Sequence, residues 1–164
     1  MRIVVLVKEV PDTYGDRRLS LETGLADRGA GEAVLDEIGE RALEVALSYA
    51  DTTPDTEVVL LSMTPESAAG TVRKGLAMGA GSAVQVVDEG LLGADVGLTA
   101  EVLAAALRRT GFDLVIAGNQ STDGVGGAIM AEGGMSRRLV AFAGLALMHG
   151  LVARKRLEIG RAHV

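Results

Sequence analysis

The sequence predicts an α/β fold, in which a doubly wound and mainly parallel sheet carries helices on both faces. Two observations lead to this prediction. Four short runs of apolar, mostly β-branched residues are typical of strands that are buried on both faces. Three longer segments with helical spacing separate these runs, so strand and helix alternate as they do in βαβ units. The 164 residues amount to about one domain.

The first predicted strand covers residues 1–7, which are almost entirely apolar. Pro11 then begins a polar, glycine-containing loop that we expect to reach about residue 33. The first helix is predicted over residues 36–50, because its apolar residues recur at spacings of three and four. Acidic residues at its start suit the positive end of the helix dipole, and Pro54 ends the segment.

A second strand is predicted over residues 57–62, which contain an unbroken apolar run. The following helix is expected to begin at Thr64 or Pro65, since proline is favoured in the first helical turn. It should end near Met78, where the flexible sequence Gly-Ala-Gly follows.

The second half of the sheet follows the same pattern. A third strand is predicted over residues 83–87 and a third helix over residues 98–109. Asp95 or Thr99 can cap the start of this helix, and Gly111 follows its end.

The fourth predicted strand, residues 113–117, runs directly into the glycine-rich loop Gly118–Gly127. Successive backbone N–H groups in such a loop can cradle a phosphate, and its Asn, Gln, Ser and Thr side chains add neutral donors. No Gly-Lys-Ser/Thr follows, so the loop is not a Walker A motif, and it does not follow the first strand as the dinucleotide fingerprint does. A phosphate loop and an ordinary β–α turn both stay open.

Ligands of parallel sheets bind beyond the carboxyl ends of the strands. Residues 8–14, 62–65 and 118–127 are expected at this edge. Lys8 could face a ligand there, although a solvated charge at a strand end is the simpler interpretation. Asp36 could face an adenosine hydroxyl, although capping the helix is the simpler role.

The composition excludes several kinds of catalytic site. The chain has no Cys and only two His, which argues against thiol chemistry, a thiolate metal site and a Ser-His-Asp triad. Aromatic residues make up 2% of the chain, too few for a base-stacking surface. No catalytic constellation emerges, so the sequence favours a binding or carrier role over an enzyme.

Charge is distributed unevenly along the chain. Residues 1–127 carry 10 basic and 20 acidic residues, whereas residues 128–164 carry 6 basic and 2 acidic ones. The acidic part repels nucleic acids and anionic lipids, so we expect no nucleic-acid partner. The longest apolar stretch, residues 139–153, is shorter than the ~18 residues of a membrane span. We therefore expect no membrane insertion and a cytoplasmic protein of a bacterium.

Four segments in order resemble the β subunit of electron transfer flavoproteins. They are Met1–Asp12 with the sequence MRIVVLVKEVPD, Asp36–Glu44, Arg73–Ala80 with RKGLAMGA, and Asp113–Gly127. Each motif is weak alone, but the four at these separations are specific. The resemblance covers residues 1–127 and implies a Rossmann-like, adenine-nucleotide-binding domain.

The resemblance implies a subunit of an electron carrier. An α subunit would hold most of an FAD, and this chain would bind AMP as a structural ligand. Electrons would arrive from acyl-CoA and other flavin dehydrogenases and leave to the electron transfer flavoprotein–quinone oxidoreductase.

The resemblance also implies site residues. Contacts to AMP are expected from Leu6, Asp36, Glu37, Ile38, Gly39, Met63, Gly118, Asn119, Gln120, Ser121, Thr122, Asp123, Gly124, Val125, Gly126 and Gly127. Thr13 and Tyr14 match the segment that approaches the flavin ring. No catalytic residue and no metal ligand are expected.

Two alternatives to the carrier subunit stay open. A free-standing adenine-nucleotide-binding module of the stress-protein type would use the same loop without an α subunit. A phosphoryl- or nucleotidyl-transfer enzyme would need a carboxylate set and a cationic clamp, for which Lys8, Asp12 and Asp123 are the candidates.

Residues 128–164 resemble no part of the family and lack its C-terminal arm, which embraces the α subunit. The last seven residues, Glu158–Val164, are similar to a translated sequencing adapter. A foreign sequence, from a frameshift or an assembly error, and a divergent native tail are both open interpretations.

Overall fold

The structure, a computed structural model, describes residues 1–12, 14–15, 18–25, 27–29, 31–123 and 139–143. A five-stranded parallel sheet forms its centre, with the order β5-β4-β1-β6-β7. The strands are β1 (Arg2–Leu6), β4 (Glu57–Met63), β5 (Ser82–Val86), β6 (Leu114–Gly118) and β7 (Leu139–Ala143). The helices are α1 (Glu37–Thr52), α2 (Ala69–Ala77) and α3 (Val96–Thr110), with short 3₁₀ turns η1 (Glu66–Ala68) and η2 (Glu89–Leu91). The predicted α/β class is confirmed.

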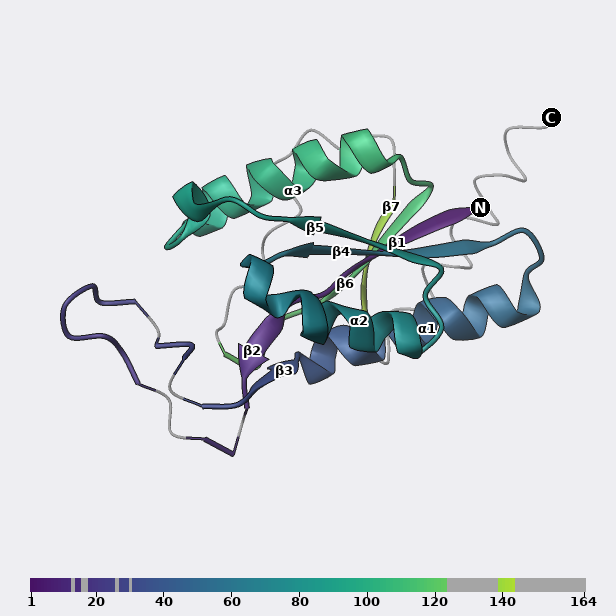
Figure 1. The fold of residues 1–164 in the computed structure, drawn as a ribbon. Helices are drawn as coiled ribbons and strands as arrows, with labels where there is room; N and C mark the ends of the chain where they lie inside the picture. Colours follow the sequence, from purple (N-terminus) through teal and green to yellow (C-terminus); the bar gives the residue numbers. More distant parts are fainter. Residues whose placement is uncertain (13, 16–17, 26, 30, 124–138, 144–164) are drawn as a thin grey trace.

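Helices cover both faces of the sheet. α1 and α2 lie on one face and α3 on the other (Figure 1). Each strand of the sheet centre supplies side chains to both faces in alternation, so every residue of β1 from Ile3 to Val5 is buried. This explains why these strands are unbroken apolar runs and do not alternate with polar residues.

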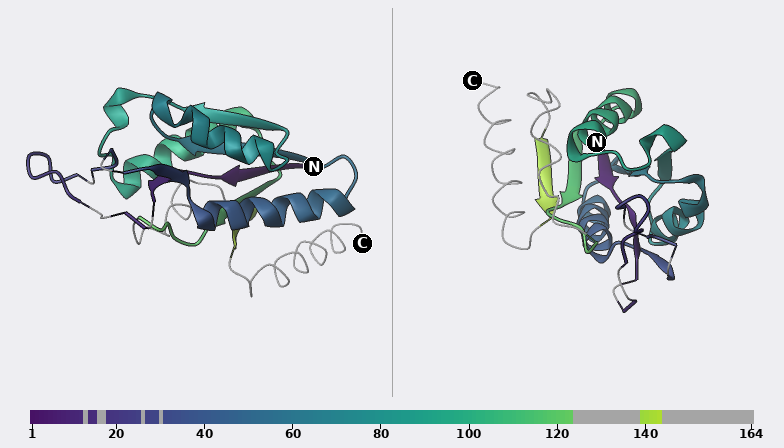
Figure 2. Two further views of the ribbon diagram at one scale, coloured as in Figure 1. Left: turned by 60° about the horizontal axis from the view of Figure 1, so that its bottom comes forward. Right: turned by 90° about the vertical axis from the view of Figure 1, so that its left-hand side faces the viewer.

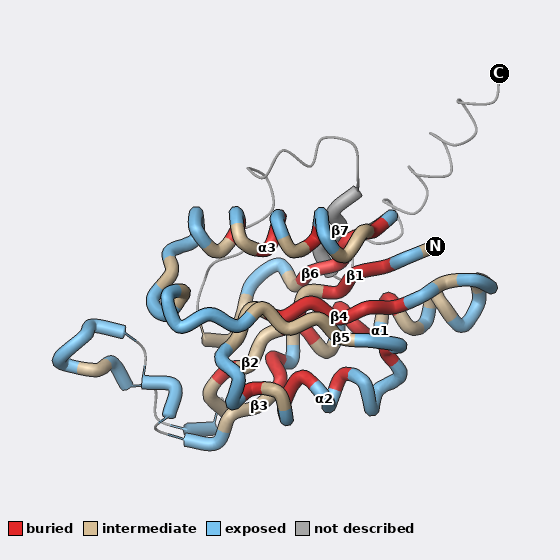
Figure 3. The backbone as a smooth tube through the Cα atoms, turned by 45° about the horizontal axis from the view of Figure 1, so that its top comes forward, coloured by how far each residue is buried: buried red, intermediate tan, exposed pale blue. Residues whose placement is uncertain are grey.

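Two hydrophobic cores result, one on each face of the sheet. Figure 3 marks the buried residues in red along the backbone. The core on the α1 side comprises Ile3, Val5, Val7, Leu35, Ala42, Leu43, Ala46, Val58, Leu60, Ala80 and Ile116. The core on the α3 side comprises Val4, Val59, Leu61, Leu103, Leu107, Phe112 and Val115. Burying one such Val, Leu or Ile side chain contributes about 1.5–3 kcal/mol, so the two layers together hold the sheet.

The helix ends follow the sequence signals. Asp36 caps α1, where its side chain accepts a hydrogen bond from the backbone N–H of Ile38. Asp95, one of the two predicted caps, begins α3 by accepting from the N–H of Leu98. Gly111 ends α3 with a φ of 72°, a conformation that favours glycine.

The predicted loop from Pro11 to about residue 33 has a short strand at each end, which the sequence did not predict. β2 (Glu9–Pro11) and β3 (Ala33–Leu35) pair there as a two-stranded antiparallel sheet beside the main one. Each strand is only three residues long, too short to show a periodicity in the sequence. The second predicted helix also differs, because η1 precedes α2 and the helix proper begins at Ala69.

β7 begins the longest apolar stretch of the sequence, residues 139–153, in which no strand was expected. It pairs in parallel with β6 over five positions, from Leu114 opposite Leu139 to Gly118 opposite Ala143. Figure 2 shows β7 at the edge of the sheet, next to β6. None of the helices in the described ranges combines the length and apolarity needed to cross a membrane.

The strand order reverses between β1 and β6. From β1 the chain adds β4 and then β5 on one side, and it then returns across the sheet to β6 on the other side. Such a topological switch point opens a crevice at the carboxyl ends of the two strands. The residues that follow β1 and β6 are therefore the first candidates for a binding site.

Gly118, at the end of β6, packs against the first turn of α1. A Cβ atom there would lie 2.5 Å from Cγ2 of Ile38 and 3.2 Å from the backbone oxygen of Gln120. We expect Gly118→Ala to lower the free energy of unfolding by about 1–3 kcal/mol, measured by urea denaturation. Adding Ile38→Ala should remove part of this cost, so the double variant loses less than the sum of the single variants.

Gly70 provides the matched control. A Cβ at this position in α2 would meet no atom within 4 Å, so Gly70→Ala should leave stability unchanged or raise it by up to about 1 kcal/mol. Strictly additive losses for Gly118→Ala and Ile38→Ala would contradict the packing described here.

Candidate functional site

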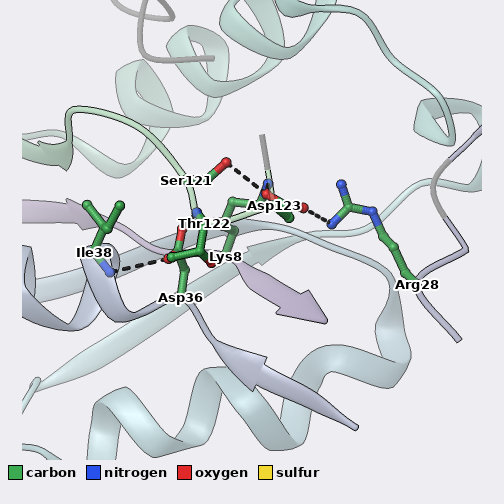
Figure 4. A network of polar contacts seen from close by, with 7 residues as sticks. All are labelled: Lys8, Arg28, Asp36, Ile38, Ser121, Thr122 and Asp123. Atoms are coloured by element: carbon green, nitrogen blue, oxygen red, sulfur yellow. Dashed lines mark hydrogen bonds and ion pairs between the residues drawn. The ribbon is translucent and has the colours of Figure 1, made fainter. Parts of the chain in front are cut away.

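The switch point brings the residues after β1 and β6 into direct contact. Lys8 follows β1, and its Nζ lies 2.7 Å from Oδ1 of Asp123, in the loop after β6. The Lys8 side chain is 37% exposed and the Asp123 side chain 8% exposed. The interpretation of Lys8 as a solvated charge is therefore wrong, because a nearly buried carboxylate holds its ammonium group (Figure 4).

Asp123 also binds two other groups. Nη1 of Arg28, in the segment between β2 and β3, lies 2.6 Å from Oδ2 of Asp123. The hydroxyl of Ser121 donates to Oδ1 at 2.8 Å. Figure 4 shows Lys8, Arg28 and Ser121 pointing toward this carboxylate from three segments of the chain.

The pKa of Asp123 lies below its usual value. Burial alone would raise it, because a charged group loses hydration. Hydrogen bonds from Lys8 and Ser121, together with the positive charges of Lys8 and Arg28, lower the pKa by more than burial raises it. Asp123 is therefore ionised at neutral pH, and it counters part of the positive charge at this edge.

Asp36 joins the first turn of α1 to the same loop. It is 2% exposed, and its Oδ1 accepts from the N–H of Ile38 at 3.2 Å. Its Oδ2 lies 3.4 Å from the backbone nitrogen of Thr122, and its own N–H donates to the carbonyl of Lys8. Of the two roles that the sequence left open, the structure assigns Asp36 the helix cap, and both carboxylate oxygens face backbone N–H groups of the chain.

The first turn of α1 approaches both strand ends closely. A Cβ on Gly39 would lie 3.7 Å from Cα of Val7, and Gly118 packs against Ile38. Small residues at these two positions allow the helix start, the end of β1 and the loop after β6 to meet.

The remaining predicted site residues divide into four groups. Ile38, Gly39, Gly118, Ser121, Thr122 and Asp123 gather with Asp36 around the loop. Glu37, Asn119 and Gln120 are exposed beside them. Leu6 and Met63 are half-buried against the core on the α3 side. Tyr14 is 98% exposed, and Thr13 and Gly124–Gly127 lie outside the described residues.

The hydroxyl of Thr122 is buried and has no hydrogen-bond partner among the described residues. The buried hydroxyl of Ser62, unlike that of Thr122, has a partner, because it lies 3.2 Å from the hydroxyl of Thr64. Ser62 therefore stabilises the turn after β4. Gln85 donates to Thr64 and to the carbonyl of Pro65 and thereby holds the turn after β4.

Arg28 is the site residue that sequence reasoning missed. It stands in a polar segment with no periodicity and no recognisable motif, about 95 residues before the carboxylate that it binds. Only the fold reveals this contact. Within the described ranges, no group of three or more His, Asp and Glu side chains is arranged to hold a metal ion.

Comparisons with known proteins identify the family of the chain. Residues 23–134 match the electron transfer flavoprotein domain. The electron transfer flavoprotein subunit beta of Mycobacterium tuberculosis is 48% identical over 134 residues, which cover 79% of this chain and 50% of the relative. The same subunit of Mycobacterium leprae gives the same identity and coverage.

A third relative is named for a larger complex. Subunit CarD of the caffeyl-CoA reductase–Etf complex of Acetobacterium woodii is 39% identical over 125 residues, or 76% of this chain and 47% of the relative. The chain thus spans about half the length of the curated relatives it matches. On the matched domain and these identities, the chain belongs to the electron transfer flavoprotein family, where its relatives are β subunits.

Proposed function

We propose that this chain acts as the β subunit of an electron transfer flavoprotein and that it binds AMP at the carboxyl edge of β1 and β6. The observation that carries the proposal is the glycine-rich loop after β6, which is tied to the end of β1 and to the start of α1 at the switch point. Membership of the family supports the same assignment.

The residues at this edge suit a nucleotide monophosphate. The loop Gly118–Gly127 would hold the phosphate through its backbone N–H groups, with Lys8 and Arg28 supplying positive charge nearby. The buried Thr122 hydroxyl is a polar group that a ligand can satisfy. Asp36 would orient the loop, because its carboxylate already faces two backbone N–H groups.

The remaining proposed contacts for the adenosine part are Leu6, Asp36, Glu37, Ile38, Gly39 and Met63. Leu6 and Met63 belong to β1 and β4, the neighbouring strands whose carboxyl ends lie beside the loop. Their half-buried apolar side chains suit a base better than a phosphate.

The flavin would belong mainly to the α subunit. When bound, an FAD supplies the electron-accepting and electron-donating chemistry, which this chain, without Cys, does not supply through side chains of its own. Thr13 and Tyr14 are the proposed residues near the flavin, and the fully exposed Tyr14 ring is available for such a contact. On this proposal the chain is a carrier subunit and not an enzyme.

The proposed partners follow from the same role. They are an α subunit, acyl-CoA and other flavin dehydrogenases as electron donors, and an electron transfer flavoprotein–quinone oxidoreductase as acceptor. The alternative, a free-standing adenine-nucleotide-binding module, would use the same loop without any of these partners.

We also propose that residues 1–127 form the nucleotide-binding domain and that residues 128–164 lie outside it. All contacts described at the candidate site come from residues 8–123.

Nucleotide titration tests the binding proposal. We expect AMP to bind the purified chain at one site in isothermal titration calorimetry. Adenosine should bind at least about tenfold more weakly, because it lacks the charge-assisted hydrogen bonds of the phosphate. ATP bound more tightly than AMP by a stable homodimer would instead favour the free-standing module.

Co-purification tests the carrier proposal. The full-length Mycobacterium tuberculosis relative, co-expressed with its α subunit, serves as the reference and should elute as a yellow, flavin-containing complex. The present chain, which aligns with about half of that relative's length, should give a weaker complex with the same α subunit. Absence of both flavin and AMP from the full-length complex would refute the proposed role, and a tight complex with the present chain would contradict the second expectation.

Limited proteolysis tests the domain proposal. The proposed boundary predicts a protease-resistant fragment that ends near residue 130, identified by mass spectrometry. β7 provides the competing outcome, because its pairing with β6 would protect the chain to Ala143. A resistant fragment that ends there would move the boundary beyond β7.

A further inference from the structure

Asp123 is the point at which three segments of the chain meet. Lys8 reaches its Oδ1 from the end of β1, and Arg28 reaches its Oδ2 from the segment between β2 and β3. Lys8 hydrogen-bonds to one carboxylate oxygen and Arg28 forms an ion pair with the other, so the two cations face opposite oxygens of the group.

The orientation of the Asp123 carboxylate affects the two residues before it in the loop, Ser121 and Thr122. Thr122 precedes Asp123, its N–H faces Asp36, and its buried hydroxyl has no partner in the described part of the chain. Ser121 donates to the same Oδ1 that Lys8 binds. Turning the Asp123 carboxylate would thus disturb the donors of the loop on which the proposed phosphate contact relies.

We propose that Arg28 is a positioning residue for the nucleotide loop and that it acts through Asp123, not by touching the nucleotide itself. This inference rests on the proposed function. Its role differs from that of Lys8, because Lys8 closely follows a strand of the main sheet, whereas Arg28 lies between β2 and β3, outside that sheet.

The expected loss of AMP affinity on removing Arg28 follows from the solvent exposure of the ion pair. The Arg28 side chain is 53% exposed, while that of Asp123 is 8% exposed. An ion pair with one half-exposed partner is screened by water and salt, so its loss should cost about two- to fivefold in affinity.

The test compares AMP affinity in Arg28→Gln, Arg28→Lys and Arg109→Gln by titration calorimetry. Arg28→Gln should raise the Kd for AMP about two- to fivefold at low salt, and the gap from the unmodified chain should close in high salt. Arg28→Lys keeps the charge and should restore most of the affinity. Arg109→Gln removes one positive charge at the opposite edge of the sheet, in the last turn of α3, and should leave the Kd unchanged.

A second measurement reads the carboxylate directly and needs no nucleotide. The Asp123 side chain, followed by nuclear magnetic resonance during a pH titration, should show a higher pKa in Arg28→Gln than in the unmodified chain, because one of its two cations is lost. A variant that failed to fold would be recognised by circular dichroism, and Arg28→Met, which keeps the length of the side chain without its charge, would then carry the comparison.

The outcomes separate this inference from the proposed function. AMP binding that is equal in the unmodified chain, Arg28→Gln and Arg109→Gln would overturn the role of Arg28 and leave the nucleotide site standing. An unchanged Asp123 pKa in Arg28→Gln would overturn it as well. No AMP binding by the unmodified chain would overturn the proposed nucleotide site and this inference together.

Discussion

The contact between the first turn of α1 and the ends of β1 and β6 determines the arrangement of the rest of the site. Gly39 lets the helix approach Val7, and Gly118 leaves room for Ile38. Asp36 connects these three segments. Its carboxylate caps the helix and faces the N–H of Thr122, and its own N–H donates to the carbonyl of Lys8. With the helix in this place, the loop after β6 can leave the sheet in few directions, and Asp123 is brought beside Lys8.

The two carboxylates at this edge have different tasks because their surroundings differ. Asp36 faces backbone N–H groups, so it shapes the chain. Asp123 faces Lys8 and Arg28, which keep it ionised despite its burial. Two cations and two carboxylates meet at this edge, whereas the whole chain carries a net charge of −6, so the edge is less acidic than the chain as a whole.

Sequence periodicity predicted the elements that are buried, because burial imposes the pattern. The strands β1, β4, β5 and β6 and the helices α1 and α3 lie within a few residues of their expected positions. β2 and β3 were not predicted because three residues cannot display a period, and β7 lies in an apolar stretch, residues 139–153, whose residues alternate poorly. At the site, the glycine-rich loop and the Asp36 cap could be predicted from local residue types. The pairing of Arg28 with Asp123 could not, because it depends on how distant segments meet in space.

A carrier subunit as proposed here has to bind a nucleotide and a partner subunit, and the polar network concerns only the nucleotide. The described groups of this network come from the end of β1, the segment between β2 and β3, the first turn of α1 and the start of the loop after β6. The Tyr14 ring, the proposed contact near the flavin, is exposed and is not part of this network. Under the proposed function, loss of partner binding therefore need not disturb the nucleotide edge. The fold can serve a carrier subunit and a free-standing nucleotide-binding module with the same edge, and the difference between them lies in the surfaces around it.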